Sequence, residues 1–223
     1  MICTESGYAL LEAVFSQAEM QGVREGLSST LLDRTKAGAR HVLSVPVVRD
    51  VAVDCRLLAI AGEFLGRDAQ PFRATLFDKS RTANWLVVWH QDTALPVCRR
   101  CDDPTWGPWS RKAGVLYARA PAWALEQVVA LRVNLDDSSQ TNGPLRVVPN
   151  THMSGVLTDA AIEQITRGAT PVACVTRAGG VVAMRPLTVH ASSKSLDDRP
   201  RRVLHIEYAA TVNLATGIEL AVA

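Results

Sequence analysis

The first seventy residues follow a helical pattern of apolar and polar positions. Apolar side chains recur three and four positions apart, a spacing that places them on one face of an α-helix. A glycine at position 66 follows the last of these stretches, and glycine readily ends a helix. The pattern predicts three helices, over residues 10–27, 47–53 and 56–65.

From Pro71 onward the pattern changes to short runs rich in valine, leucine and tryptophan, bounded by glycine, proline, asparagine or aspartate. Such runs are typical of β-strands. They predict eight strands, over residues 72–77, 84–92, 128–135, 145–148, 172–175, 181–184, 187–190 and 202–210. Helices followed by many short strands with long connections indicate an α+β fold whose strands form a barrel or jelly roll.

One connection between predicted strands is unusually long. It covers residues 93–127, and a connection of that length often acts as a functional lid. Trp106 and Trp109 lie in its middle. We expect a single domain over residues 1–223, with a mainly helical support (1–70) and a jelly-roll core (71–210) that contains a long loop near 93–127.

Composition agrees with one packed domain. The chain has 223 residues, of which 48% are hydrophobic and 21% charged, which is enough apolar material for a core. The formal net charge of +2 gives no reason to expect a nucleic-acid or membrane partner. The first residues lack a basic segment followed by an apolar run, so we expect a cytoplasmic protein.

The five cysteines are an odd number in a chain without a visible export signal, so they are expected to be free thiols. Cys98 and Cys101 have the CxxC spacing of zinc and redox sites. A tetrahedral zinc site needs four ligands, and the sequence has no second CxxC or HxxxH to complete one. We interpret the pair as two thiols in a loop.

The sharpest chemical signal is His90-Gln91-Asp92 at the end of an apolar run. Residues two apart on a strand point to the same side, so an imidazole and a carboxylate would project together. A carboxylate beside a buried strand needs a partner, and a metal ion is one. By itself, however, the pair is more typical of a His–Asp hydrogen bond at a strand end.

A second apolar run, about a hundred residues downstream, also ends in a histidine, His190. Two histidines and one carboxylate leave three coordination positions open, which is the facial triad of non-haem Fe(II) oxygenases. The open positions are needed there because a cosubstrate and O₂ bind the same ion. His90, Asp92 and His190 are therefore the candidate metal ligands.

After His190 the chain passes through a polar turn and enters another predicted strand at Arg201 and Arg202. A hairpin-like return would place an arginine beside the strand that carries His190. A planar guanidinium can bind the distal carboxylate of a keto acid with two hydrogen bonds. Taken alone, these residues favour the alternative of two surface arginines.

Together these segments resemble the phytanoyl-CoA dioxygenase family over roughly residues 71–210. The segments that carry the resemblance, in the expected order and spacing, are His90-Gln91-Asp92, residues 142–152, His190-Ala191-Ser192 and Arg201. The family usually has Pro-Gly-Ser/Thr-His where this chain has Asn150 in place of the glycine. Asparagine also tolerates a left-handed backbone, so we expect the same turn, with His152 as a structural histidine.

The resemblance implies a double-stranded β-helix, a cupin-like jelly roll, with N-terminal helices packed on one side. It implies that Fe(II) is bound by the candidate triad and that 2-oxoglutarate is bound by Arg201, eleven residues after His190. Ser192 would be a second contact for 2-oxoglutarate. Thr75 is a further candidate contact, because its strand lines the cosubstrate cavity in the family.

The implied reaction uses O₂, converts 2-oxoglutarate to succinate and CO₂, and hydroxylates a small-molecule substrate. Asp92 argues against halogenation, because related halogenases keep that coordination position free for chloride. Two alternatives stay open. One is a non-catalytic jelly-roll module that binds a ligand, and the other is a cupin-like metalloenzyme that does not use 2-oxoglutarate.

Strand alternation and family spacing disagree about which arginine points inward. Alternation places Arg202 on the face of Leu204, Ile206 and Tyr208, so an apolar-core argument would turn Arg202 inward. Family spacing selects Arg201, and we follow the spacing.

Basic residues on the predicted strands bear on the substrate. Arg73 and Lys79 share one strand face, and Arg132 interrupts an otherwise apolar strand. These charges fit an anionic substrate, although for Arg73 and Lys79 solvent-facing charges fit equally well. The expected substrate-binding residues are Arg73, Lys79, Thr93, Arg132, Trp106 and Trp109.

Two further histidines, His41 and His205, are interpreted as structural. His41 lies in a segment between helices, and His205 lies within a strand with no carboxylate two residues before it. Neither has the strand-end pattern of the candidate ligands.

Overall fold

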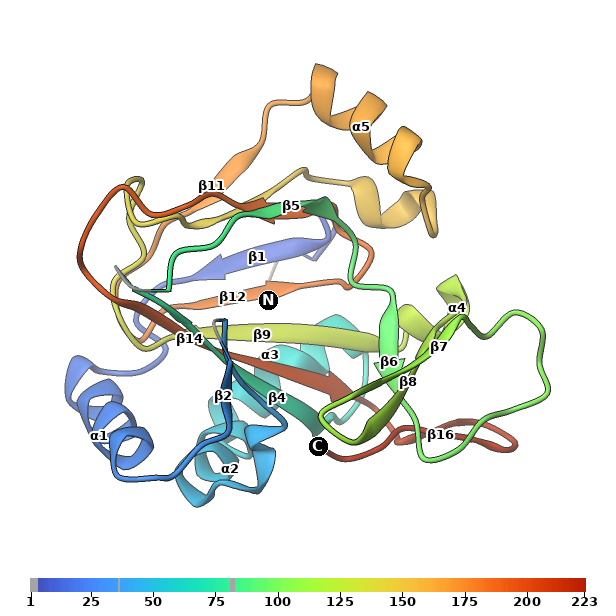
Figure 1. Cartoon of the computed structure of the whole chain (residues 1–223), viewed down its shortest axis with the longest axis horizontal. Coiled ribbons are helices and arrows are strands. Elements are labelled where there is room, and N and C mark those ends of the chain that lie inside the picture. Colours follow the sequence, from blue (N-terminus) through green and yellow to red (C-terminus); the bar gives the residue numbers. More distant parts are fainter. Residues whose placement is uncertain (1–3, 36, 81–82) are drawn as a thin grey trace.

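The computed structural model of this chain describes residues 4–35, 37–80 and 83–223. Two antiparallel sheets face each other, and three helices cover the outer side of the larger sheet (Figure 1). The fold is the mixed α+β jelly roll that the sequence predicted, with its N-terminal helices on one side.

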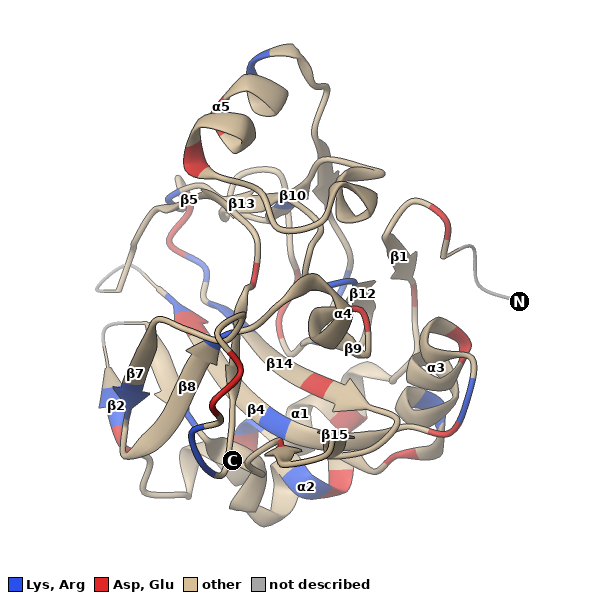
Figure 2. Cartoon of the chain, turned by 90° about the vertical axis from the view of Figure 1, so that its right-hand side faces the viewer, with Lys and Arg blue, Asp and Glu red and all other residues tan. Residues whose placement is uncertain are grey.

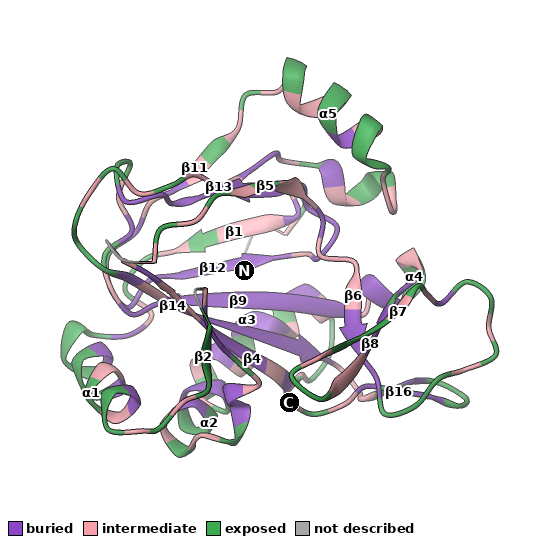
Figure 3. Cartoon of the chain, in the orientation of Figure 1, coloured by how far each residue is buried: buried purple, intermediate pink, exposed green. Residues whose placement is uncertain are grey.

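The larger sheet has seven strands within the described chain, in the order β1-β12-β9-β14-β4-β3-β2. In that order, their bounds are Tyr8–Leu11, Val181–Met184, Val128–Asn134, Arg201–Ala209, Gln70–Lys79, Gly38–Arg40 and Arg34–Thr35. All neighbouring strands are antiparallel. The central strands are buried over most of their length, so both faces of this sheet are covered (Figure 3).

The smaller sheet has the order β11-β10-β13-β5. Its strands are Val172–Cys174, Leu145–Val147, His190–Ser192 and Val87–His90. In the pairing of β13 with β5, His190 lies directly opposite His90. The register of this sheet therefore brings together two histidines that lie far apart in the sequence.

Three helices pack their apolar faces under the larger sheet, and each begins at a recognisable signal. They are α1 (Gln17–Ser28), α2 (Pro46–Ala52) and α3 (Cys55–Leu65). Ser16 and Glu19 form a capping box before α1, a proline occupies the first position of α2, and Asp54 caps α3. Gly66 ends α3 in the left-handed conformation, as predicted.

The helical prediction for residues 10–27 is wrong at its beginning. Tyr8–Leu11 forms β1, which pairs with β12 at the edge of the larger sheet, and the helix starts only at Gln17. The apolar run of residues 8–11 is explained equally well by a half-covered edge strand, and periodicity alone does not separate the two. The N-terminal region is accordingly less helical than expected, because β2 and β3 also join the sheet.

Two predicted strands are displaced. The strand predicted over residues 84–92 is shorter, Val87–His90, and the strand predicted over 187–190 begins only at His190. Residues 185–189 form the connection into β13, and the Asp92 amide donates to the Pro186 carbonyl in it (2.9 Å). The turn expected at Asn150 is confirmed, since its φ of 68° is left-handed.

The segment 93–127, predicted to be a long loop, contains regular elements as well as an irregular stretch over residues 98–108. It contains a three-stranded sheet in the order β6-β8-β7, with bounds Ala94–Pro96, Val115–Arg119 and Trp109–Lys112, and the short helix α4, Ala122–Leu125. Trp106 is buried there and packs edge-on against Trp123. This small sheet stands beside the larger sheet (Figure 1).

The remaining elements are short or lie outside the two main sheets. They are the 3₁₀ turns η1 (Val42–Ser44) and η2 (Thr151–Ser154), helix α5 (Asp159–Gly168), and the pair β15 (Asn213–Ala215) and β16 (Ile218–Glu219). Helices α1 to α3 carry both basic and acidic residues (Figure 2). In the described chain, every helix is too short or too polar to cross a membrane.

The cysteines within the described residues agree with the thiol prediction. Cys55, Cys98, Cys101 and Cys174 are all free, while Cys3 lies outside the described residues. Cys98 and Cys101 belong to no cluster of metal-ligating side chains found in the described chain. The described fold therefore brings no third metal-ligating side chain to this pair.

Candidate active site

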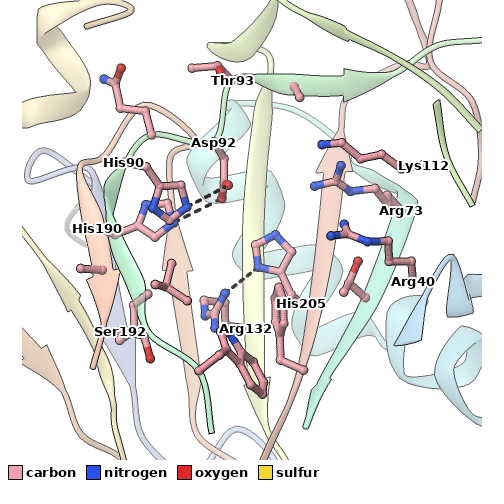
Figure 4. A pocket seen from close by; sticks show the side chains of 18 of the residues that line it. Arg40, Arg73, His90, Asp92, Thr93, Lys112, Arg132, His190, Ser192 and His205 are labelled. Carbon is pink, nitrogen blue, oxygen red and sulfur yellow. Dashed lines mark hydrogen bonds and ion pairs between the residues drawn. The ribbon is translucent and has the colours of Figure 1, made fainter. Parts of the chain in front are cut away.

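The predicted convergence of His90, Asp92 and His190 is confirmed by the fold. One ligand atom from each residue lies within 4.8 Å of the others. Asp92 Oδ1 is 3.7 Å from His90 Nε2, and Asp92 Oδ2 is 3.5 Å from His190 Nε2. The centroids of the two imidazole rings are 4.2 Å apart, because the histidines are cross-strand neighbours on β5 and β13. Figure 4 shows the three side chains pointing toward one point.

Hydrogen bonds prepare both imidazoles for a metal. The Nδ1 atom of His90 lies 2.8 Å from the Val88 carbonyl, and that of His190 lies 2.8 Å from the Thr188 carbonyl. Since a carbonyl only accepts hydrogen bonds, each Nδ1 is the protonated nitrogen, and each Nε2 lone pair faces Asp92. Two imidazole nitrogens and one carboxylate fit the facial ligand set of an Fe(II) site.

The electrostatics of the triad also suit a cation. Burial lowers the pKa of His190 to about 4, so this ring is neutral near pH 7. Although burial opposes it, the two histidines hold the pKa of Asp92 well below its usual value, so this carboxylate is ionised. A neutral imidazole and an ionised carboxylate are the forms that bind a metal ion.

Gln91 holds the strand end that carries His90 and Asp92. Its amide nitrogen donates to the carbonyls of Gly155 (2.9 Å) and Leu187 (2.7 Å), and its carbonyl accepts from the Leu157 amide (2.8 Å). The side chain thus ties β5 to the two connections that surround it. Sequence reasoning treated Gln91 only as the middle of the motif, and its positioning role depends on tertiary contacts.

Arg201 is buried and lines the same cavity as the triad. Its Nη2 lies 3.4 Å from Ser192 Oγ, and its Nε donates to the Asn142 carbonyl (3.2 Å). Burial, followed by the nearby charge of Arg132, lowers the pKa of Arg201 to about 10. The guanidinium remains charged at pH 7, and none of its hydrogen bonds in the described chain goes to a carboxylate.

Arg202 points the other way. Its guanidinium forms a bidentate pair with Asp136, and its backbone amide donates to the same carboxylate. The apolar face of β14 that Arg202 shares packs against the helices, so the inward face of the jelly roll is the polar one. The geometry therefore agrees with the family spacing and not with the apolar-core argument.

Lys79 is buried directly beside Arg201 and Ser192. It is the register partner of Arg201, and its Nζ donates to Ser192 Oγ (3.0 Å) and to the Ser193 carbonyl (2.5 Å). Burial, followed by the charges of Arg201 and Arg132, lowers the pKa of Lys79 to about 7. Lys79 therefore lies behind the Arg201 end of the cavity rather than on its wall, where the strand pattern had placed it.

The cavity between the sheets has a volume of about 380 Å³. Its wall includes the triad, Arg201, Ser192, and the predicted residues Arg73, Thr75, Thr93 and Arg132. Its basic residues are Arg40, Arg73, Lys112, Arg132 and Arg201, whereas Asp92 is the one acidic residue on this wall. The site is therefore strongly cationic within the described structure.

A buried chain of polar contacts runs along one wall. Arg132 Nη1 donates to His205 Nδ1 (3.0 Å), so the His205 proton in the neutral ring lies on Nε2, which faces Glu207 at 3.6 Å. Glu207 in turn pairs with Arg73. The Arg73 charge is thus balanced by a protein carboxylate, while Arg132 has an imidazole partner.

Three expectations about the wall are corrected. Trp106 lies in a separate apolar cluster, and Trp109 stacks under Arg100 on the small sheet, so neither tryptophan lines the cavity. Trp109 begins β7 of the small sheet, whereas Trp106 lies in the irregular stretch that precedes this strand. His205, interpreted as purely structural, lies on the cavity wall.

Sequence reasoning also missed Arg40 and Lys112, which both line the cavity. Arg40 belongs to the short strand β3, and Lys112 belongs to β7 of the small sheet. Neither residue lies within a motif. Because both come from segments expected to be helical support or loop, no local signal identified them.

Comparisons with known proteins agree with this geometry. The sequence model of the phytanoyl-CoA dioxygenase (PhyH) family matches residues 3–203 of this chain. No curated protein sequence matches significantly.

Solved structures show the same fold at low sequence identity. The non-heme, α-ketoglutarate-dependent epimerase SnoN from nogalamycin biosynthesis has a TM-score of 0.66 and 18% identity, over 93% of this chain and 79% of that one. HygX from Streptomyces hygroscopicus, crystallised with nickel and 2-oxoglutarate, has a TM-score of 0.65 and 19% identity, over 93% and 84%. EctD from S. alaskensis, crystallised with 2-oxoglutarate and 5-hydroxyectoine, has a TM-score of 0.71 and 19% identity, over 94% and 74%.

Proposed function

This chain belongs to the phytanoyl-CoA dioxygenase family and is an Fe(II)- and 2-oxoglutarate-dependent oxygenase, and from this premise we propose that it hydroxylates a small anionic molecule. The observation that carries the proposal is the joint placement of the His90–Asp92–His190 triad and Arg201 on one cavity. When bound, Fe(II) supplies the oxidative decarboxylation of 2-oxoglutarate to succinate and CO₂, and with O₂ the power to oxidise a C–H bond.

In this proposal the buried basic end of the cavity binds 2-oxoglutarate. Arg201 holds the distal carboxylate with two hydrogen bonds, because its guanidinium is charged and has no carboxylate partner among the described residues. Ser192 Oγ lies between Arg201 and Lys79, so it orients both donors. Thr75 lines the same wall and is a further hydroxyl contact.

The prime substrate occupies the rest of the cavity. Arg132 is a buried cation whose described partner is the imidazole of His205, and its charge adds to the positive potential that attracts anions into the cavity. Arg73 contributes shape more than charge, because Glu207 already neutralises it. Thr93 follows Asp92 on the wall and would contact the substrate near the triad.

The decisive test is succinate formation from 2-oxoglutarate, measured by mass spectrometry with and without Fe(II), under O₂. We expect iron-dependent succinate that increases when a pool of small organic acids is added. One atom of ¹⁸O from ¹⁸O₂ enters succinate in every case, so incorporation of the second atom into the oxidised substrate would identify hydroxylation. An oxidised substrate without ¹⁸O would identify another oxidative outcome. A non-catalytic binding module or a cupin-like enzyme that ignores 2-oxoglutarate would produce no iron-dependent succinate.

Lys79 makes 2-oxoglutarate binding pH-dependent. With a pKa of about 7 in the free protein, its amine is mostly neutral at pH 8. A nearby carboxylate favours the charged form and raises the pKa, so binding at pH 8 should take up roughly one proton. The affinity for 2-oxoglutarate should therefore fall as the pH rises from 7 to 9.

Calorimetric titrations in two buffers with different ionisation enthalpies measure this proton uptake. Lys79→Met should abolish it, and Lys194→Met, which removes a lysine outside the cavity, should leave it unchanged. Equal proton uptake by the wild type and Lys79→Met would exclude Lys79 from the binding site.

A further inference from the structure

The basic residues of the cavity differ in depth. Arg201 and Arg132 are buried, with exposed fractions of 3% and 8%, whereas Arg40 is exposed and Lys112 is partly exposed. The cavity therefore has a buried cationic end and a second cationic group at its opening. In Figure 4, Lys112, Arg73 and Arg40 lie along one wall and point across the cavity toward the triad side.

Arg40 and Lys112 have no salt-bridge partner among the described residues, although the carboxylates of Asp92 and Glu207 attract Lys112. Neither side chain forms an ion pair there, although the neighbouring Arg73 is paired with Glu207. Burial, and then repulsion from Arg40 and Arg73, lowers the pKa of Lys112. An anion bound beside Arg40 and Lys112 would offset part of the repulsion among these two cations and Arg73.

Contacts of Lys112 and of His41, the neighbour of Arg40, fix the two segments that carry these cations. Lys112 Nζ lies 4.8 Å from the centre of the Tyr117 ring, a cation–π contact. The Tyr117 hydroxyl is 2.8 Å from His41 Nε2, and His41 directly follows Arg40. This contact links β8 of the small sheet to the end of β3 in the larger sheet, so the distance between the two basic residues depends on both sheets.

We propose that Arg40 and Lys112 bind the carboxylate or phosphate group of the prime substrate at the cavity opening. The inference rests on the proposed function, because it assumes that 2-oxoglutarate occupies the buried end at Arg201. The substrate would then be an organic anion that enters with its uncharged end first. The C–H bond presented to the triad lies at the end of the molecule opposite its charged group.

The test uses simple probes of one size, because the substrate itself is unidentified. The Zn(II)-loaded protein is first saturated with 2-oxoglutarate at neutral pH. It is then titrated separately with benzoate, with phenyl phosphate and with benzamide, a neutral isostere of benzoate. Saturation-transfer NMR measures the binding of each probe. We expect at least one of the two anions to bind roughly tenfold or more tightly than benzamide. The anion that binds more tightly indicates whether the site prefers carboxylate or phosphate.

The double variant Arg40→Gln/Lys112→Gln should lose this preference. Its matched control is Arg49→Gln/Arg111→Gln, which removes the same charge from exposed positions, one of them adjacent to Lys112 on β7. The control should bind the anions as the wild type does. Equal affinity of the wild type for the anions and benzamide, or equal losses in the two double variants, would overturn the inference.

Failure of this inference is distinguishable from failure of the proposed function. Binding of 2-oxoglutarate to the Zn(II)-loaded wild type is measured first, without any probe. Absence of that binding would contradict the proposed function. The probe titrations would then be run on the Zn(II) form alone, where the comparison of the two double variants still decides the role of Arg40 and Lys112.

Discussion

Replacement of His190 by alanine should weaken Fe(II) binding by roughly a hundredfold or more, because it removes one of three ligands from a preorganised site. His190 Nε2 faces Asp92 at 3.5 Å, and its Nδ1 is held by the Thr188 carbonyl, so no other side chain of the described chain is oriented to replace it. Anaerobic Fe(II) titration measures the affinity, and iron-dependent succinate formation should be lost in the same variant.

His152→Ala is the matched control for this prediction. His152 lies on η2, outside the cavity, and belongs to no metal-ligating cluster in the described chain. This variant should bind Fe(II) as tightly as the wild type. If His190→Ala retained wild-type affinity while folded, as judged by circular dichroism, the triad would not be the iron site.

Replacement of Arg201 by alanine should remove 2-oxoglutarate binding while leaving metal binding intact. Loss of a buried, charge-assisted contact costs about 2–5 kcal/mol, which corresponds to a weakening of roughly 30-fold to several thousand-fold. Arg201→Lys should restore only part of the affinity, because an ammonium group cannot make the bidentate contact of a guanidinium. Fe(II) and 2-oxoglutarate are titrated separately into each variant.

Arg202→Ala separates this role from a general loss of charge on β14. Arg202 pairs with Asp136 away from the cavity, so its replacement should leave the affinity for 2-oxoglutarate close to that of the wild type. Unchanged 2-oxoglutarate affinity in Arg201→Ala would retire the assignment. A loss confined to Arg202→Ala would transfer the role to its neighbour.

Local sequence patterns were sufficient to predict the features that depend on residues adjacent in the chain. The period of two along a strand placed His90 and Asp92 on one side, and Gly66 marked the end of α3. Asn150 adopts the left-handed turn that its residue type allows. Each of these features is decided by the backbone geometry of a few adjacent residues, so it can be inferred without knowledge of the fold.

The convergence of His190 with His90 could be predicted only in part from local sequence patterns. The two strand ends were visible in the sequence, but their union depends on the pairing of β13 with β5. The family resemblance supplied that pairing, because it carries the topology of the jelly roll. The choice of Arg201 over Arg202 also came from spacing, since the inside of this jelly roll is a polar cavity and not an apolar core.

Only the tertiary structure decided the composition of the substrate side of the cavity. Arg40 and Lys112 come from two different sheets, and Glu207 cancels the charge of Arg73 across a strand pair. Trp106 is buried in an apolar cluster that joins the 93–127 segment to Phe72 and Ala209 of the larger sheet and to Leu220. Such contacts join residues far apart in the chain, and no local periodicity records them, because the free energy that fixes them comes from packing between elements.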